Sequence, residues 1–397
     1  MAGKLPMGSK DMVRAKMMEM VVQGHKSLAE ASGVLKISYR QAKRIYRCYR
    51  EEGERGLIHG NVGKPSHRRI DEEVRRAAIE IYRREYGDFG PTLAGEKLAQ
   101  RHGIVVDHET LRRWLIAEGL WQRKRNRHTY RQRRRRRERF GEMVQFDGSH
   151  HEWFEGRAEG CCLMNMVDDA TGRTFGFLCP QETTVAAMQL LWGWIERYGI
   201  PQAVYCDRKN AFVLDREATI QEQLQGIVPK SPFEVACEKL GIEVIVARSP
   251  QAKGRVERSH GVYQDRLVKE LRLRAISEIE AANGYLGEEF LAQVNDKFAK
   301  LPAEPEDAHV PMVGKQDLHN ILCFEEQRVV SRDYVVQFQG RCYQVLRDNR
   351  RRPRPESKVI VHKWLDESVH IFWENKELLV QEIPRPQRKE EAAKLTA

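Results

Sequence analysis

The sequence predicts a multidomain protein with two all-α units first, a mixed α/β domain next and a small all-β domain last. Three observations support this order. Residues 10–121 carry apolar side chains at helical spacing. From residue 141, short apolar runs alternate with helical segments, and beyond residue 321 only short strand-like runs separated by turns remain. A chain of 397 residues is also too long for one ordinary core.

Composition narrows the class of protein. Charged residues make up 31% and hydrophobic residues 41%, which is typical of a soluble globular protein. No apolar run approaches the ~20 residues that span a bilayer, and the N-terminus lacks a signal-peptide core. None of the eight cysteines forms a CxxC pair, so a zinc site is not expected. Buried free thiols in a reducing cytoplasm are the better interpretation.

The first unit, residues 1–62, has predicted helices at 10–23, 27–33 and 38–53. The last two begin with capping boxes, Ser27 with Glu30 and Ser38 with Gln41. Two short helices joined by a tight turn are typical of a helix-turn-helix DNA-binding domain. The basic side chains expected to contact DNA are Arg40, Lys43, Arg44 and Arg47. A three-helix interaction module with a solvated basic face is the alternative.

The second unit, residues 68–121, has predicted helices at 71–84, 92–101 and 108–118. It is interpreted as another helix-turn-helix, and a wing remains an open alternative. Its third helix directs Arg112 and Arg113 outward toward DNA and Trp114 inward.

Residues 122–140 form an arginine-rich linker. Positions 123–139 hold eleven Lys or Arg and one Glu, a net charge of +10 out of the chain's +11. We expect this arm to bind DNA phosphates, although a solvated linker or a targeting signal would look similar. The candidate contacts are Arg133, Arg134, Arg135, Arg136 and Arg137.

Residues 141–273 have the pattern of an α/β domain. Strands are predicted at 143–146, 162–167, 174–179, 203–206 and 243–247, with helices at 184–198, at 233–240 and from about 255. Asp168 and Asp169 lie between the second and third strands and are assigned to a hairpin turn. Three antiparallel strands followed by alternating helices and strands are the order of a ribonuclease-H-like fold.

Three acidic residues of this domain are candidate metal ligands. Asp147 and Asp207 follow apolar strand-like runs, and Glu257 lies early in the last helix. Singly, each could simply cap a turn or complement a helix dipole. Together, three carboxylates at the rim of one sheet could hold two Mg²⁺ ions, which favour oxygen ligands and catalyse phosphoryl transfer in pairs.

The rest of the chain divides into three segments. Residues 274–320 are expected to be a helical connector, residues 321–383 a small β-barrel, and residues 384–397 a disordered tail. The barrel is expected to contain five strands, the first at 334–338.

The chain resembles bacterial insertion-sequence transposases of the DDE class, whose catalytic core is like that of retroviral integrases, and especially the ISNCY-like group. The matching motifs are QFDGSHHEWF, CLMNMVDDATGR, YCDRKNAF, SPQAKGRVERSHG and PEDAH. The resemblance implies that Asp147, Asp207 and Glu257 are the catalytic residues and hold two Mg²⁺ ions, with Mn²⁺ as a substitute. This chain differs from the family pattern in two ways: Arg208 follows Asp207, where many relatives have Asn-Gly, and the gap between Asp207 and Glu257 is long.

The resemblance also implies partners and a reaction. The partners would be transposon ends and target DNA, bound by at least a dimer. The reaction would be cleavage at the ends and joining of the 3′-hydroxyls to target DNA. A DNA-binding regulator with an inactive core and a structure-selective nuclease are the alternatives. Further candidate DNA contacts lie around Glu257: Lys253, Arg255, Arg258 and His260.

Overall fold

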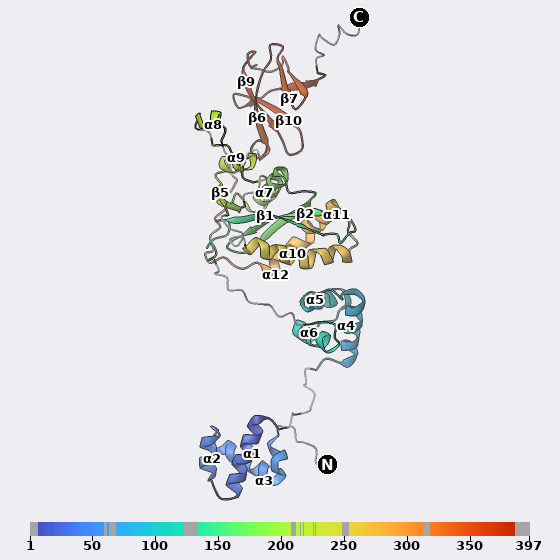
Figure 1. Ribbon diagram of the computed structural model, residues 1–397, viewed down its shortest axis with the longest axis vertical. Coiled ribbons are helices and arrows are strands. Elements are labelled where there is room, and N and C mark those ends of the chain that lie inside the picture. Colours follow the sequence, from blue (N-terminus) through green and yellow to red (C-terminus); the bar gives the residue numbers. More distant parts are fainter. Residues whose placement is uncertain are drawn as a thin grey trace. The chain divides into compact units, whose positions relative to one another are not determined.

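The computed structural model describes residues 7–58, 62, 69–122, 134–207, 212–214, 216, 218–224, 226, 228–247, 254–312 and 318–385. The chain divides into two compact units, Met1–Arg125 and Asn126–Ala397. The helices and strands of both units are labelled in Figure 1. In the described residues, every helix is too short or too polar to cross a membrane.

The N-terminal bundle contains α1 (Ser9–Val22), α2 (Leu28–Val34), α3 (Tyr39–Glu52) and a 3-10 turn, η1 (Gly53–Leu57). The Ser27 capping box is complete, because Ser27 N donates to Glu30 Oε2 at 2.7 Å and Glu30 N donates to Ser27 Oγ at 3.3 Å. Helix α2 was predicted to end at Gly33 but ends one residue later, at Val34. Lys36, two residues beyond, takes the left-handed conformation at φ 51°.

The second bundle contains α4 (Glu72–Glu85), α5 (Pro91–His102) and α6 (His108–Ala117). Asp107 caps α6 by accepting from the backbone of Glu109 at 2.9 Å. Residues 69–122 contain helices and turns but no strand, so a wing is absent from this stretch. Trp114 is only half-buried, whereas its neighbour Leu115 is fully buried.

The second compact unit, Asn126–Ala397, is built on a five-stranded mixed sheet of order β3-β2-β1-β4-β5. Strands β1, β2 and β3 are antiparallel, and β4 and β5 run parallel to β1. Four of these strands match the predicted runs closely. Their bounds are β1 (Val144–His151), β2 (Cys161–Asp168), β3 (Thr174–Cys179), β4 (Ala203–Cys206) and β5 (Glu243–Val246).

Strand β1 is longer than predicted. The expected strand stops at residue 146, where the apolar run gives way to the polar run DGSHH. In the structure the pairing with β2 continues to His151 opposite Cys161. Asp147 therefore lies within the strand rather than after it.

Helices cover both faces of this sheet (Figure 1). On one face, α7 (Thr184–Tyr198) and α9 (Pro232–Lys239) share a core with Phe146. On the other face lies α10 (Gly254–Leu273), whose Tyr263 is fully buried. A short helix, α8 (Ile220–Leu224), lies in the long stretch between β4 and α9.

The predicted connector packs on the sheet. Its α11 (Ile279–Tyr285), a π-helical turn η3 (Leu286–Phe290) and α12 (Leu291–Phe298) join the α10 core. Asn295 brackets Thr174 on the edge strand β3, accepting from its N–H at 2.7 Å and donating to its carbonyl at 2.9 Å. Asn283 does the same to Leu178. Two side chains thus satisfy part of an edge that lacks a neighbouring strand.

Backbone contacts tie residues 304–310 to the start of this unit. Glu304 N donates to Glu138 O at 3.0 Å, Ala308 N donates to Phe140 O at 2.7 Å, and Val310 pairs with Ile200.

The C-terminal strands form two sheets, β11-β10-β9-β6 and β12-β8-β7, that share one hydrophobic core. The closed barrel is therefore not confirmed. The sequence analysis also missed the first strand, β6, because four of its six residues (FEEQRV) are polar and none of the six is buried. The elements are α13 (Leu318–Ile321), β6 (Phe324–Val329), β7 (Val335–Phe338), β8 (Arg341–Val345), β9 (Lys358–Lys363), β10 (Val369–Trp373), β11 (Lys376–Glu377) and β12 (Val380–Ile383). The tail from residue 386 lies outside the described residues.

Candidate active site

Asp147 lies in β1, and Asp207 directly follows the neighbouring parallel strand β4, which ends at Cys206. Val144 pairs with Val204 and Gln145 with Tyr205, an offset of 60 residues (204 − 144). The two acids have the same offset (207 − 147), so the register, continued by two residues, sets them side by side. Neighbouring strands lie about 4.8 Å apart. Both residues are half-buried, and Asp147 Oδ1 accepts from Gly148 N at 3.1 Å.

Glu257 lies in the first turn of α10 and is exposed. Two hydrogen bonds hold this turn to the sheet: Val256 N donates to Gln145 Oε1 at 3.2 Å, and Asn165 Nδ2 donates to Ser259 Oγ at 3.0 Å. Asn165 is the cross-strand partner of Asp147. Glu257 is thus flanked in the helix by residues that are bonded to neighbours of Asp147.

The side of β1 that faces α10 is polar. Side chains alternate along a strand, so Gln145, Asp147 and Ser149 share one face. Gln145 and Ser149 are both hydrogen-bonded to α10, the latter by Gln264 Nε2 at 3.3 Å. Asp147 lies between them. The predicted catalytic residues therefore come from three elements that the fold brings together.

The donor set suits a hard divalent cation. All three side chains offer carboxylate oxygens, the ligands that Mg²⁺ and Mn²⁺ favour. The three do not form a cluster in which every ligand atom lies within 4.8 Å of the others. A site for two ions 3.5–4 Å apart does not require that, because its outer ligands bind different ions. The described residues contain two such tight clusters elsewhere: His150, Cys162 and Glu182, and Cys323, Glu325 and His362.

Asp168 and Asp169 are both fully buried but have different roles. Asp168 builds the predicted turn by accepting from Thr171 N at 2.7 Å and from Gly141 N at 3.0 Å. Burial raises the pKa of the Asp168 carboxyl despite these hydrogen bonds. Asp169 is also a residue of this turn, but its side chain pairs with Arg134 of the arginine-rich segment and with Arg255 of α10.

The end of the arginine-rich segment is docked on the sheet domain. Arg134 pairs with Asp169, Arg137 N donates to Asp169 Oδ2 at 2.8 Å, and Arg136 Nη1 donates to Ala170 O at 2.8 Å. Arg135 is exposed. Arg133 and the rest of the arm back to residue 123 lie outside the described residues.

The four basic candidates around Glu257 differ in their exposure. Arg255 is turned inward, with 18% of its side chain exposed and an ion pair to Asp169, and His260 is buried at 8%. Neither placement fits a direct DNA contact, because α10 packs on the sheet with this side. Arg258 is exposed, and Lys253 lies outside the described residues.

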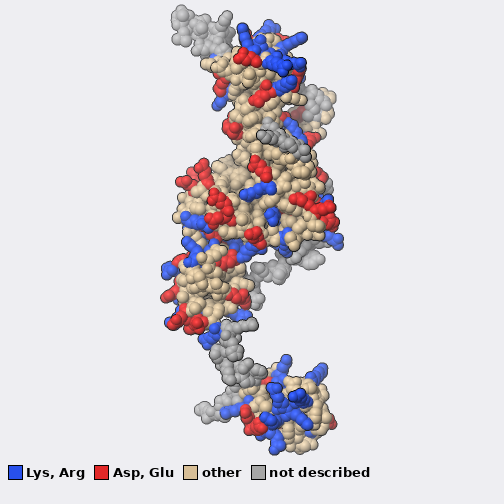
Figure 2. All heavy atoms as spheres, turned by 180° about the vertical axis from the view of Figure 1, so that it is seen from behind, with Lys and Arg blue, Asp and Glu red and all other residues tan. Residues whose placement is uncertain are grey.

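The basic candidates of the two helical bundles are mostly exposed. Figure 2 shows Lys and Arg gathered on one face of the N-terminal bundle. In the second bundle, Arg112 and Arg113 both contact Glu109, at 2.6 and 3.3 Å, and Arg113 is the more exposed at 74%. The fully exposed candidates of α3 are Arg40, Lys43, Arg44 and Arg47.

Sequence reasoning missed three polar residues that support the site: Gln145, Asn165 and Ser259. A signal was present for the first, because Gln145 precedes Asp147 by two positions in an otherwise apolar run. A polar residue in such a run, on the same face as an acid, indicates a buried partner. Asn165 carried the same signal, as the one polar residue in the apolar run CCLMNMV, whereas no comparable signal marked Ser259.

Comparison with known proteins finds similarity both for the N-terminal helices and for most of the chain. A family model described as a helix-turn-helix domain matches residues 13–68. The chain is 34% identical over 393 residues to a protein of Sinorhizobium fredii (strain NBRC 101917 / NGR234) that is named as a transposase, y4bF, covering 98% of this chain and 85% of that protein. It is 27% identical over 359 residues to the transposase for insertion sequence IS1202 of Streptococcus pneumoniae, covering 81% of this chain and 75% of that protein.

Among solved structures, the catalytic core domain of HTLV-2 integrase in complex with magnesium matches at 19% identity and a TM-score of 0.29, over 37% of this chain and 83% of that one. A simian T-cell lymphotropic virus intasome chain, in complex with PP2A regulatory subunit B56 gamma, matches at 15% identity and a TM-score of 0.34. That match covers 78% of this chain and 100% of the other.

Proposed function

The chain belongs to the transposase family of these two bacterial relatives, and from that premise we propose that it binds the terminal inverted repeats of a mobile element, cleaves DNA at the ends by metal-assisted hydrolysis and joins the 3′-hydroxyl ends to target DNA. The observation that carries this proposal is the parallel pairing of β1, which contains Asp147, with β4, which Asp207 directly follows, together with the hydrogen bond that ties the first turn of α10 to Gln145 of β1.

Asp147, Asp207 and Glu257 would hold two Mg²⁺ ions, with Mn²⁺ as a substitute. Bound there, the ions would lower the pKa of the attacking water and offset charge on the leaving oxygen. The protein's own part is to fix the carboxylates on rigid elements, which β1 and α10 do. Arg258, exposed next to Glu257, suits a DNA phosphate. The scheme requires no covalent intermediate and hence no Ser or Tyr nucleophile.

DNA binding is assigned to the helical units. The helix-turn-helix model matches residues 13–68, which include most of α1 and all of α2 and α3, and α3 with its four exposed basic residues would act as the recognition helix in the major groove. The arginine-rich arm would add phosphate contacts, which increase affinity without reading sequence. Both ends of an element must be brought together, so the active form would be at least a dimer.

Asp147→Asn tests the catalytic assignment. The variant keeps the size of the side chain and removes its charge, so it should lose nicking and joining of a terminal-repeat duplex in Mg²⁺ and in Mn²⁺ yet bind that duplex as the wild type does. Asp265→Asn is the matched control, because Asp265 is an exposed acid on α10 that pairs with Lys269 of the same helix. It should leave both activities intact.

Other outcomes separate the alternatives. A wild-type protein that binds the duplex but never nicks it with either ion would favour a regulator. A wild-type protein that nicks but never joins a 3′-hydroxyl to a new duplex would favour a nuclease. Full activity in Asp147→Asn would overturn the assignment of the site.

A further inference from the structure

Asp169 is a buried carboxylate at which three separate parts of the chain meet, and the proposed reaction does not use it directly. We propose that Asp169 is a positioning residue: it couples docking of the arginine-rich segment 134–137 to the placement of the first turn of α10, and hence of Glu257. This inference rests on the proposed function and adds a means by which the arm influences the active site.

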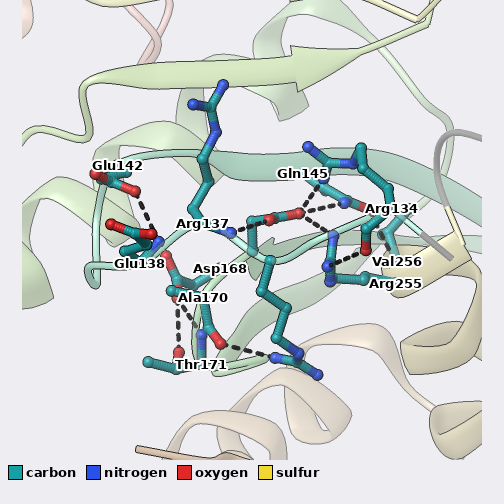
Figure 3. A network of polar contacts seen from close by, with 12 residues as sticks. Arg134, Arg137, Glu138, Glu142, Gln145, Asp168, Ala170, Thr171, Arg255 and Val256 are labelled. Atoms are coloured by element: carbon teal, nitrogen blue, oxygen red, sulfur yellow. Dashed lines mark hydrogen bonds and ion pairs between the residues drawn. The ribbon is translucent and has the colours of Figure 1, made fainter. Parts of the chain in front are cut away.

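The contacts of Asp169 come from the segment, from β1 and from α10, and their donors Arg137, Gln145 and Arg255 are labelled in Figure 3. Its carboxylate pairs with the side chains of Arg134 and Arg255, and it accepts from Arg137 N at 2.8 Å and from Gln145 Nε2 at 2.9 Å. Arg255 also reaches the segment directly, since its Nη2 donates to Arg134 O at 3.3 Å. One carboxylate therefore holds all three elements.

Gln145 extends the network to the catalytic helix. Its Nε2 donates to Asp169 while its Oε1 accepts from Val256 N at 3.2 Å. The opposite orientation of the amide would set oxygen against carboxylate and NH₂ against N–H, so Asp169 fixes the orientation that Val256 requires. Val256 immediately precedes Glu257, and Gln145 lies two residues before Asp147 on the same face of β1.

Charge makes this arrangement sensitive to Asp169. The carboxylate is fully buried and has two guanidinium partners. If its charge is removed, Arg255 becomes a largely buried cation next to a second cation, an arrangement that is strongly unfavourable without a carboxylate. The side chains can relieve it only if the segment or the first turn of α10 moves away. Either movement changes the surroundings of Glu257.

The arm is accessible to DNA while it is docked. The Arg134 side chain is 41% exposed although it pairs with Asp169, and Arg135 is exposed beside it. Phosphates bound along the arm would therefore act on the same segment that Asp169 holds. The expected consequence is that DNA engagement and the geometry around Glu257 depend on each other.

Hydrogen exchange of the full-length protein, followed by mass spectrometry, tests the coupling without relying on catalysis. In Asp169→Asn we expect faster exchange both at residues 134–140 and at residues 254–258. The matched control is Asp168→Asn, because the Asp168 carboxylate is equally buried but accepts from Thr171 of the turn and from Gly141 N rather than from α10. It should leave residues 254–258 as protected as in the wild type.

A surface variant guards against misfolding. Arg134→Gln alters a partly exposed side chain and should also speed exchange at residues 254–258, whereas Arg135→Gln should not. Both Asp169→Asn and Arg134→Gln should raise the Mg²⁺ concentration for half-maximal cleavage by about tenfold, as changes behind metal ligands commonly do. Binding of the terminal-repeat duplex by Asp169→Asn should stay within about twofold, because the helical units supply most contacts.

The outcomes are distinct. If Arg134→Gln and a folded Asp169→Asn leave residues 254–258 protected, the coupling is refuted whatever the activity. If exchange rises as expected but the wild-type protein does not cleave DNA, the coupling stands and the proposed function fails.

Discussion

Asn295→Ala should lower the free energy of unfolding of the compact unit Asn126–Ala397 by about 2–4 kcal/mol. The substitution removes two hydrogen bonds to Thr174, at 2.7 and 2.9 Å. Each is worth about 0.5–1.5 kcal/mol net, and the loss rises to roughly 1–3 kcal/mol per bond where a buried backbone group is left without its partner. Thr174 is 3% exposed, so water reaches the freed groups poorly. The higher helix propensity of alanine offsets a few tenths of a kcal/mol.

Urea unfolding, followed by the fluorescence of the buried Trp153 and Trp194, measures this loss. Gln293→Ala is the matched control, because Gln293 is exposed on the same helix and should change the free energy of unfolding by less than about 0.5 kcal/mol. Asn283→Ala should cost a similar amount as Asn295→Ala, and the two losses should add, since their sites on β3 are about 13 Å apart. A loss for Asn295→Ala no larger than that of the control would show that the edge needs no side-chain partners.

Two further predictions concern packing and charge. Gly141→Ala should lower the free energy of unfolding by about 2–4 kcal/mol, because a Cβ there would meet the ring of His309 at 2.4 Å, with φ already at +90°. Gly156→Ala is the control, because Gly156 also has a positive φ but lies in open space, and it should cost only about 1 kcal/mol. Equal losses for the two variants in thermal unfolding would refute the clash. Glu325→Gln should flatten the acid-induced loss of stability: His362 lowers the pKa of Glu325 from 4.5 to about 2, so this carboxylate stabilises the fold above pH 4.5 and its contribution disappears as the pH falls toward 2. Urea titrations at pH 7 and pH 3 check this, and an unchanged pH dependence in the variant would contradict it.

Much of the fold could be predicted from the sequence, because helix caps and apolar runs depend only on residues that are close together in the chain. Helix starts followed from side-chain caps such as Ser27 and Asp107, whose hydrogen bonds the structure contains. The buried strands β3 and β4 followed from apolar runs. Strand β1 was underestimated because its second half is polar, and only pairing with β2 keeps DGSHH extended. Such pairing depends on residues far away in the chain, which periodicity does not report.

The candidate acids could also be named from the sequence, but their support could not. Asp147, Asp207 and Glu257 stand in recognisable motifs, and their catalytic role remains a prediction. The network around Asp169 joins residues 134, 145 and 255, which are separated by up to 121 positions along the chain (255 − 134). The sequence indicated a turn at Asp169, and this was incomplete, because a buried carboxylate is defined by the cations that gather on it.

The pairing of residues 304–310 with residues 138–140 and 200 has a practical consequence for cutting the gene into pieces. A fragment that ends with α10 at Leu273 would keep every candidate acid. It would lack Asn283 and Asn295, which bind the edge strand β3, and the backbone hydrogen bonds to residues 138–140 that precede β1. Such a piece should be poorly soluble, and its inertness would say nothing about the chemistry of the intact molecule. Expression trials that seek the smallest independently folding catalytic body should begin by residue 134 and continue to residue 312.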